Sequence, residues 1–526
     1  MTVRLLRPYA GQAAMTVYTG SDEDVLKATG SADDNLEGAS DYATFKRRQQ
    51  GSRLSAGGLT SALQASGVPR VFGNPSPYRV VASRGKVPHN ANTMASKYGA
   101  TNGAAAVRRE SRRWMPFLSV APSGRLWIMF QNSYISGNAG GEMAGPTGVT
   151  IMAGLEVVNN GTAVSRAIKF PAATAGIDPD RTFGLGAVTT GDQTTYTPAA
   201  GEIWFGYVDL TDYGFTAWPA NADVWVRTSE AFTSGVALLD QFSTTSSIQS
   251  PSRDWTRVFD STQTQAAANQ TLGTGDITGT AGNVGTGNAA AWSATAILGT
   301  WGVQSLPSVL ANGDSILTGS SLTFDYGADV NGGAGNGSGS FQHIACRRAG
   351  LPFVDGARGS DTYQSFNLQL KSQTRKMLML FVDQMIDEMG INSAGPGADA
   401  NLASMRKLYT EARSRGVRRI IRTTLTPQTT STDNWATLAN QTLSASRTVT
   451  KDFNAKAIAM TGRYDGPDMI VDVSGAISSP LDPDKFLTNE GNLTANYGVI
   501  DGLHPSQLVQ PLAATPLQSA LAQPLL

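Results

Sequence analysis

The stretch of sequence that decides the fold is Leu310-Ala311-Asn312-Gly313-Asp314-Ser315-Ile316-Leu317-Thr318-Gly319. Its apolar beginning predicts a short buried strand, and the residues from Ser315 onward predict the start of a helix. A serine at such a junction projects its hydroxyl from the carboxyl edge of a sheet, where free backbone N–H groups can meet an anion. Gly-Asp-Ser is also ordinary turn chemistry, so the motif alone leaves a structural turn as the alternative, with Asp314 as its cap.

A second motif, Ile500-Asp501-Gly502-Leu503-His504-Pro505, supplies what a serine nucleophile needs. Such a serine requires a base with a pKa near neutral, and the base requires a carboxylate that fixes its tautomer. Of the three histidines in the chain, only His504 has an acid three residues before it and a proline after it. His89 lies in a polar stretch, and His343 lies in a predicted helix, where packing or surface exposure is its expected role. The alternative for the second motif is a plain loop before the last helix.

Taken in this order, the two motifs resemble those of the GDSL or SGNH hydrolase family, over about residues 306–526. The resemblance implies an α/β flavodoxin-like domain with Ser315 as nucleophile, His504 as base and Asp501 as its orienting acid. It also implies an oxyanion hole formed by the N–H of Ser315, the N–H of Gly359 and the side-chain amide of Asn392.

The sequence departs from the family pattern in two places. Ile316 replaces the usual leucine, and Ser393 follows Asn392 where the family usually has aspartate. The second change can alter the loop but leaves the amide donor. Gly356, three residues before Gly359, is an alternative for the glycine of the oxyanion hole.

Predicted strands and helices alternate from residue 306 onward. The strands are 352–354, the run through Met385 and Ile386 toward Asn392, 419–424 and 469–471; the helices are 341–348, 363–376, 400–414, 433–460 and a last one after His504. This alternation predicts a parallel sheet with helices on both faces. Ligands of such sheets bind at the carboxyl ends of the strands, so we expect the motif residues to converge on one edge.

The region 111–305 has a different pattern. Short alternating runs at 125–130, 164–170, 203–208 and 224–227 are separated by turns rich in Gly, Pro, Asn and Asp. This spacing predicts a β-sandwich or jelly-roll-like domain. Its aromatic residues are expected in the core, with a carbohydrate-binding face as the alternative. Residues 271–287, rich in Gly and Thr, are expected to form a surface loop.

The N-terminal part is expected to consist of two segments. Residues 1–50 begin with two predicted short strands and a helical turn, which resemble the small anchoring segment of tailed-phage structural proteins; an ordinary β-hairpin is the alternative. Residues 51–110 show little periodicity and predict a linker or extended arm. The basic cluster Arg108, Arg109, Arg112 and Arg113 is expected to be a solvated face.

Composition excludes several classes of protein. Charged residues make up 16% of the chain and glycines number 57, which suits a β-rich extracellular or virion protein. The 41 basic and 41 acidic residues give no support for nucleic-acid binding. The single cysteine, Cys346, excludes an intrachain disulfide and a cysteine-based zinc site, and we expect it to be buried. No apolar run is long enough to span a membrane, the run 377–382 is expected in the core, and no secretory signal is expected.

These observations predict a serine ester hydrolase that needs no metal and no cofactor. The family includes lipases, thioesterases and carbohydrate acetylesterases, so the fold leaves the substrate open. The β-rich region and the phage-like N-terminus favour O-acetyl groups of a bacterial surface polysaccharide. Polar loops at 327–340, 358–364 and 426–434 favour a short acyl group, with Tyr363 and Trp435 able to stack on a sugar.

The expected setting is a phage particle. Other virion proteins would bind through the N-terminus, and a homo-oligomer is expected; the bacterial cytoplasm is the alternative location. The rival functions are a non-catalytic virion decoration or adhesion protein with an esterase-like fold, and an intracellular bacterial esterase.

Overall fold

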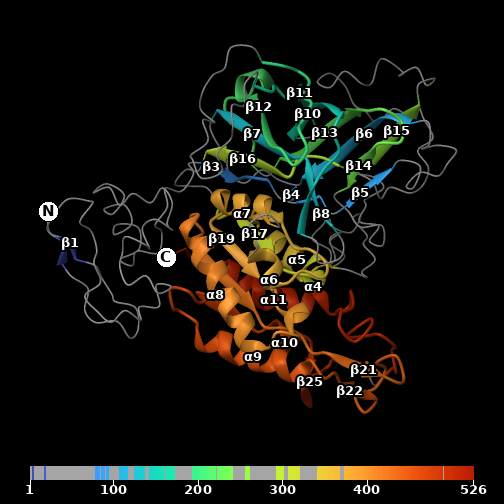
Figure 1. Ribbon diagram of the computed structural model, residues 1–526, viewed down its shortest axis with the longest axis vertical. Helices are drawn as coiled ribbons and strands as arrows, with labels where there is room; N and C mark the ends of the chain where they lie inside the picture. The colour runs from blue at the N-terminus through green and yellow to red at the C-terminus, as the bar shows by residue number, and fades with distance from the viewer. Residues whose placement is uncertain are drawn as a thin grey trace.

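The computed structural model describes residues 3–4, 17–18, 78–82, 85–88, 90–93, 106–115, 124–136, 141–159, 162–171, 192–220, 222–240, 255–260, 292–300, 306–319, 340–367, 372–489 and 491–525. Within these ranges, the two largest antiparallel sheets lie at one end of the molecule and the helices at the other (Figure 1). The expected loops 271–287 and 327–339, and nearly all of the expected anchoring segment, lie outside the described residues. The pair β1 (Val3–Arg4) and β2 (Val17–Tyr18) is antiparallel.

The helical end is built on a six-stranded sheet in which every pairing is parallel. Its order is β23 (Met469–Val471), β20 (Arg419–Thr423), β19 (Gln384–Asp387), β17 (Val309–Asn312), β18 (Phe353–Asp355) and β4 (Gly85–Lys86). Numbered along the chain from β17, the first five strands lie in the order 2-1-3-4-5, the flavodoxin-like arrangement. The strand order reverses between the neighbouring strands β17 and β19. The predicted nucleophile Ser315 follows the end of β17.

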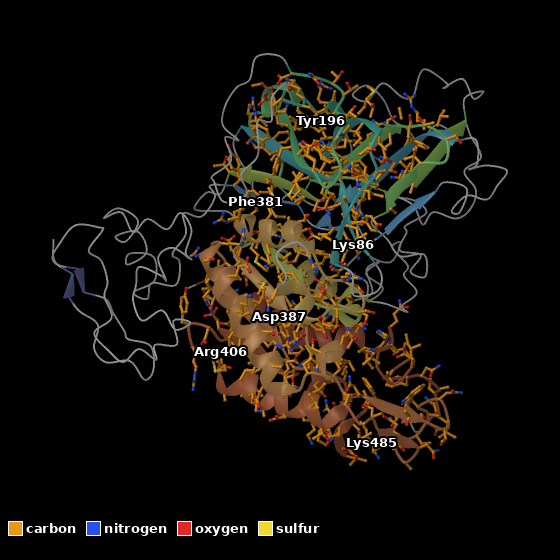
Figure 2. The ribbon with its side chains drawn as sticks, in the orientation of Figure 1. Lys86, Tyr196, Phe381, Asp387, Arg406 and Lys485 are labelled. Atoms are coloured by element: carbon orange, nitrogen blue, oxygen red, sulfur yellow. The ribbon has the colours of Figure 1, made fainter. Side chains whose placement is uncertain are left out.

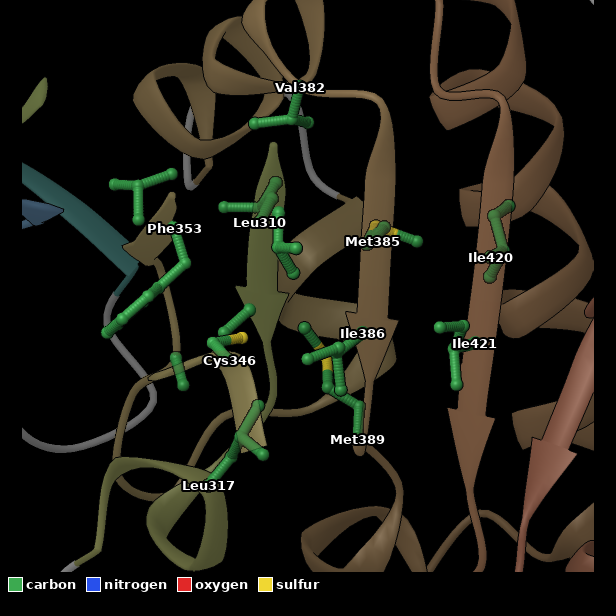
Figure 3. Packing of buried hydrophobic residues seen from close by; sticks show 14 of the residues in the cluster. Leu310, Leu317, Cys346, Phe353, Val382, Met385, Ile386, Met389, Ile420 and Ile421 are labelled. Carbon is green, nitrogen blue, oxygen red and sulfur yellow. The ribbon is translucent and has the colours of Figure 1, made fainter. Parts of the chain in front are cut away.

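Both faces of this sheet are covered. Consecutive residues of β17, Leu310 and Ala311, and of β19, Met385 and Ile386, are all fully buried although their side chains point to opposite faces. Figure 3 shows Leu310, Met385 and Ile386 on strands whose arrows point the same way. The helices are α4 (Ser315–Thr318), α5 (Phe341–Arg348), α6 (Tyr363–Asn367), α7 (Gln373–Leu378), α8 (Ala398–Ser414), α9 (Arg447–Ala459), α10 (Val473–Ile477) and α11 (Gln510–Leu521), with 3-10 turns at Met379–Phe381 and Ile391–Ser393.

Two further antiparallel sheets share a separate core. One has the order β11 (Thr162–Ala167), β10 (Thr150–Asn159), β13 (Asp223–Ala231), β6 (Ala106–Met115) and β15 (Trp255–Asp260); the other has β12 (Ile203–Asp209), β7 (Arg125–Gln131), β16 (Ala296–Thr300) and β3 (Tyr78–Val80). Val226 of the first and Ile128 and Trp204 of the second are fully buried in this core. Small two-stranded sheets pair β14 (Ala237–Asp240) with β5 (Asn90–Thr93) and β8 (Ser133–Ser136) with β9 (Gly141–Ala144), and a 3-10 turn spans Leu210–Tyr213.

The described part of residues 51–110 is not a linker, which corrects our expectation. It contributes β3, β4, β5 and the first half of β6, and β4 completes the edge of the parallel sheet beside β18. The buried Nζ of Lys86 lies 3.0 Å from Oδ2 of Asp355 on β18, at the junction of the two parts in Figure 2. The outer side of the four-stranded sheet, including Trp127 and Met129, belongs to the same core cluster as β17. The two antiparallel sheets and the α/β unit are therefore packed together.

The basic cluster of β6 is also not a solvated face. Arg109 is fully buried, and its Nη2 lies 2.9 Å from Oε1 of Glu230 on β13. The Nε of Arg112 lies 3.0 Å from Oε2 of Glu156 on β10. Because neighbouring strands supply an acid for each of these two cations, the sheet can bury them, as isolated charges could not be buried.

Two predicted helices differ from the structure. The helix expected over 363–376 is two helices, α6 and α7; the hydroxyl of Ser372 donates to the carbonyl of Phe366, so it satisfies the end of the first helix and precedes the second. The helix expected over 433–460 is limited to α9. Before α9 the chain forms the hairpin β21 (Thr429–Ser431) and β22 (Gln441–Leu443), because Asn434 and Trp435 have φ of 55° and 57°, outside the helical region. A second hairpin pairs β24 (Ser478–Ser479) with β25 (Asp482–Phe486).

Candidate active site

Ser315 begins α4 directly after β17, as its sequence predicted. The turn is fixed by hydrogen bonds that do not use the Ser315 hydroxyl. Oδ1 of Asp314 accepts from the N–H of Ile316 at 3.1 Å, and its carbonyl accepts from the N–H of Thr318 at 3.0 Å. Asp314 is therefore a helix cap, as expected from the sequence. The Ser315 side chain is left free to face the last loop of the sheet edge.

His504 lies opposite Ser315. Its Nε2 is 2.8 Å from Oγ of Ser315, and its Nδ1 is 2.7 Å from Oδ2 of Asp501. The structure thus brings together three predicted residues that come from two segments 189 residues apart. The ring is oriented by Asp501 on one side and directed at a hydroxyl on the other, which is the geometry of a nucleophile, a base and an orienting acid.

Asp501 is held in its ionised form. Burial opposes ionisation, but hydrogen bonds from the His504 ring and from the N–H groups of His504 and Leu503 outweigh it and lower the pKa of Asp501 to about 2. The carboxylate therefore stays charged at neutral pH and can stabilise an imidazolium formed at His504. Its hydrogen bonds to the N–H groups of Leu503 and His504 also fix the turn between Asp501 and His504.

The two predicted oxyanion donors lie on the neighbouring loops. The N–H of Arg358 donates to the carbonyl of Gly313 at 3.0 Å, which brings the next residue, Gly359, beside the Ser315 turn. Asn392 lies in the loop after β19, and its Nδ2 donates to the carbonyl of Asp361 at 3.2 Å. An amide has two N–H donors, so this bond leaves one donor of Asn392 for an oxyanion. The alternative Gly356 lies deeper, because a Cβ there would be 3.1 Å from Leu310 Cδ1.

One predicted aromatic is available near the site and the other is not. Tyr363 is fully buried, and its hydroxyl donates to Asp387 at 2.5 Å, so it cannot stack on a sugar as we expected. Trp435 is half-buried, and its Nε1 donates to Oγ1 of Thr429 at 3.0 Å. Its ring packs against Gly502, which lies in the turn 501–504, called the histidine turn below. The hairpin β21–β22 therefore adjoins the loop that holds Asp501 and His504.

A network of buried polar side chains lies beneath the site. Asp387, near the centre of the α/β unit in Figure 2, accepts hydrogen bonds from Tyr363, from Tyr409 at 2.6 Å and from Arg422 at 3.2 Å. The next residue, Glu388, is buried and its Oε2 accepts from the N–H of Asp314 at 3.1 Å. Sequence reasoning missed Glu388; its only signal was an acid directly after an apolar strand.

The other chemistry-bearing residues are structural. His343 is buried against Phe353, and its Nε2 is 3.4 Å from Asp355, while Cys346 is fully buried as predicted. Among the described residues, no group of three or more His, Cys, Asp or Glu side chains could hold a metal ion. None of the helices in the described ranges has the length and apolar character of a membrane span.

Comparison with known proteins gives structural neighbours only. No protein-family model matches the chain, and no curated protein matches its sequence. A lipolytic protein of the G-D-S-L family from Desulfitobacterium hafniense DCB-2 is similar, with 13% identity and a TM-score of 0.29 over 40% of this chain and 98% of that chain. A G-D-S-L family member from Veillonella parvula DSM 2008 has 12% identity and a TM-score of 0.30 over 41% of this chain and 99% of that chain. Axe2, an acetylxylan esterase from Geobacillus stearothermophilus, has 14% identity and a TM-score of 0.29 over 42% and 96%.

Proposed function

We propose that the chain is a serine ester hydrolase, and the observation that carries the proposal is the continuous contact from Ser315 through His504 to Asp501. In this reaction Nε2 of His504 takes the proton of Ser315 as Oγ attacks the ester carbonyl carbon. Asp501 stabilises the imidazolium, which then protonates the departing alcohol oxygen. Water, activated by the same imidazole, hydrolyses the acyl-serine and restores the free hydroxyl.

The oxyanion of each tetrahedral intermediate would accept hydrogen bonds from the N–H groups of Ser315 and Gly359 and from the amide of Asn392. One such donor contributes roughly 3 kcal/mol to lowering the barrier. No step in this scheme requires a metal or an organic cofactor.

Hydrolysis of p-nitrophenyl acetate by the purified chain, compared with Ser315→Ala, tests the proposal. The substitution should abolish turnover because it removes the nucleophile. The melting temperature should stay near that of the wild type, because the hydroxyl makes no bond that holds the turn. Ser360→Ala, an exposed serine of the neighbouring loop, is the matched control and should keep its activity. Near-wild-type turnover by Ser315→Ala would remove Ser315 as the nucleophile.

For the substrate, we propose a short acyl group, with acetyl on a bacterial surface polysaccharide as the natural ester. The loops 358–362 and 426–434 next to the site are rich in polar side chains, and Trp435 is the aromatic residue beside the histidine turn. A chain-length series of p-nitrophenyl esters should therefore show acetate hydrolysed faster than decanoate. The reverse preference would favour a lipid substrate.

The proposed setting is a phage particle, in which the N-terminal segment attaches a homo-oligomer to other virion proteins. The motive is the N-terminal sequence and the low charge of the chain. Recovery of the chain with purified particles tests this setting; a monomer that never associates with particles would favour an intracellular bacterial esterase. A chain that is particle-bound but inactive on every ester would favour the decoration or adhesion role.

A further inference from the structure

Glu388 holds the nucleophile turn from below at two points. Its backbone N–H donates to the carbonyl of Asn312 at 3.0 Å, and its Oε2 accepts from the N–H of Asp314 at 3.1 Å. Gly313 lies between these two anchors, and a Cβ there would be 2.9 Å from the same Oε2 and 2.7 Å from Leu317 Cβ. Glu388 therefore occupies the space that a side chain at Gly313 would need, and it fixes the backbone that leads into Ser315.

The carboxyl groups of Glu388 and Asp314 form a neighbouring pair. Both side chains are essentially inaccessible to solvent. Each uses one oxygen for a backbone N–H, and the other oxygens, Oδ2 of Asp314 and Oε1 of Glu388, have no hydrogen-bond partner among the described residues. Two ionised carboxylates can only accept hydrogen bonds, so a proton is needed for one of them to donate to the other.

The charged groups around the two carboxyl groups do not remove the need for this proton. Burial, with a smaller contribution from the charge of Asp361, raises the pKa of Asp314 to about 7, although the N–H of Ile316, the side chain of Glu388 and the nearby His504 lower it. Burial and then the charge of Asp314 raise the pKa of Glu388 well above its usual value, with Arg422 opposing. The positive charge of Arg422 is already bonded to Asp387, which also binds Tyr363 and Tyr409. The charge of Arg422 is therefore shared with Asp387 and does not neutralise both carboxylates.

We propose that Glu388 is a positioning residue for Ser315, and that it works by sharing at least one proton with Asp314 through neutral pH. The proposal rests on the proposed esterase function for its kinetic consequence but not for its protonation. When the last proton leaves at alkaline pH, two buried negative charges repel each other at the base of the turn. The Ser315 hydroxyl then loses its alignment with His504.

The kinetic test compares Glu388→Gln with Glu388→Leu. A glutamine can accept from the N–H of Asp314 and donate to its carboxylate, so it mimics the protonated acid. In the wild type, kcat should decline at alkaline pH as the pair loses its last proton. Glu388→Gln should keep kcat within about threefold at neutral pH and should lack this alkaline decline. Glu388→Leu should lower kcat at least about tenfold with little change in KM. Glu142→Gln is the matched control: Glu142 is also a buried acceptor, of the Thr374 N–H at 2.8 Å, and lies outside the Ser315 turn.

Glu142→Gln should therefore retain the alkaline decline. A Glu388→Gln variant as impaired as Glu388→Leu, or one with the wild-type alkaline decline, would overturn the proposal.

A second measurement does not depend on catalysis. Because folding raises the pKa values of the pair, its stabilising effect is fully present below about pH 4 and is lost as the pH rises through 7 and beyond. The melting temperature of Glu388→Gln should decline less between about pH 5 and about pH 9 than that of the wild type, and adding Asp314→Asn should change little further. An equally steep decline in Glu388→Gln would overturn the shared proton. If the wild type hydrolyses no ester, the esterase function fails while this measurement still decides the pair.

Discussion

Asn392 offers a test of the oxyanion hole at the scale of a single residue. Asn392→Ala should lower kcat roughly 100-fold and leave KM nearly unchanged, because the donor acts mainly on charge that develops in the transition state. Asn367 ends α6, and its side-chain amide donates to the Ser404 carbonyl at 2.9 Å, so Asn367→Ala is the control for a lost side-chain amide. If only KM rose, Asn392 would be a substrate-binding residue instead.

Asp501 connects the site to the pH dependence of stability. Its pKa is lowered to about 2 on folding, so its contribution is fully present above about pH 4 and is lost as the pH falls toward 2. The shift nominally corresponds to ~2.5 kcal/mol, but the side chain is 47% exposed, and solvent screening leaves about 1 kcal/mol. Urea unfolding of the wild type and of Asp501→Asn should therefore differ near neutral pH and converge in acid. Curves that stay parallel down to about pH 2 would contradict this assignment.

At the scale of elements, the hairpin β21–β22 sets the place of the histidine turn. The N–H of Thr429 donates to the carbonyl of Gly502 at 2.9 Å, and Gly502 has φ of 85°. A Cβ at Gly502 would lie 1.9 Å from the Thr429 carbonyl oxygen and 2.9 Å from Trp435 Cζ2. Gly502→Ala should therefore displace His504 from Ser315, lowering kcat at least about tenfold and reducing the melting temperature.

Gly462→Ala is the matched control for this prediction. Gly462 has φ of 80°, but a Cβ there would meet no atom within 4 Å. It therefore carries the backbone strain of a left-handed residue without the clash. Equal kinetic effects of the two substitutions would show that contact with the hairpin is unimportant.

The sequence predicted those elements whose signal is local. The strands around Leu310, Met385 and Ile420 and the helix 341–348 follow from apolar periodicity, and the junction at Ser315 follows from Gly-Asp-Ser. The first half of the helix expected over 433–460 was wrong, because that stretch contains no strong breaker. Instead of a helix, the chain forms a turn there, in which the Asp433 side chain accepts from the N–H of Thr437 at 3.0 Å.

The remaining errors involve partners that are distant in sequence. Arg109 reads as a surface cation until Glu230, 121 residues later, is placed beside it. Glu388 acquires its place only when β17 and β19 become neighbours. The sequence did anticipate that Ser315, His504 and Asp501 come together, whereas their catalytic roles remain a prediction.

At the scale of the whole molecule, the antiparallel sheets share a core with the α/β unit, and β4 from the N-terminal part pairs within its parallel sheet. Removing residues 1–110 would delete β3, β4, β5 and the first half of β6, and would leave Asp355 buried without Lys86. This truncated chain should fail to fold, whereas removing residues 1–50 should leave esterase activity unchanged. Circular dichroism and p-nitrophenyl acetate hydrolysis would test both. A folded and active chain that begins at residue 111 would contradict the shared architecture.

The pairing of β4 with β18 also constrains how the chain is made. Lys86 leaves the ribosome 269 residues before its partner Asp355. At about 5–20 residues per second, that interval lasts on the order of 13–54 s. Throughout this time β4 has been synthesised but its partner strand β18 has not. The N-terminal part of the chain therefore cannot complete its folding until β18 has been translated. Slowing translation between these two points should therefore increase degradation or aggregation of the nascent chain, rather than help it to fold.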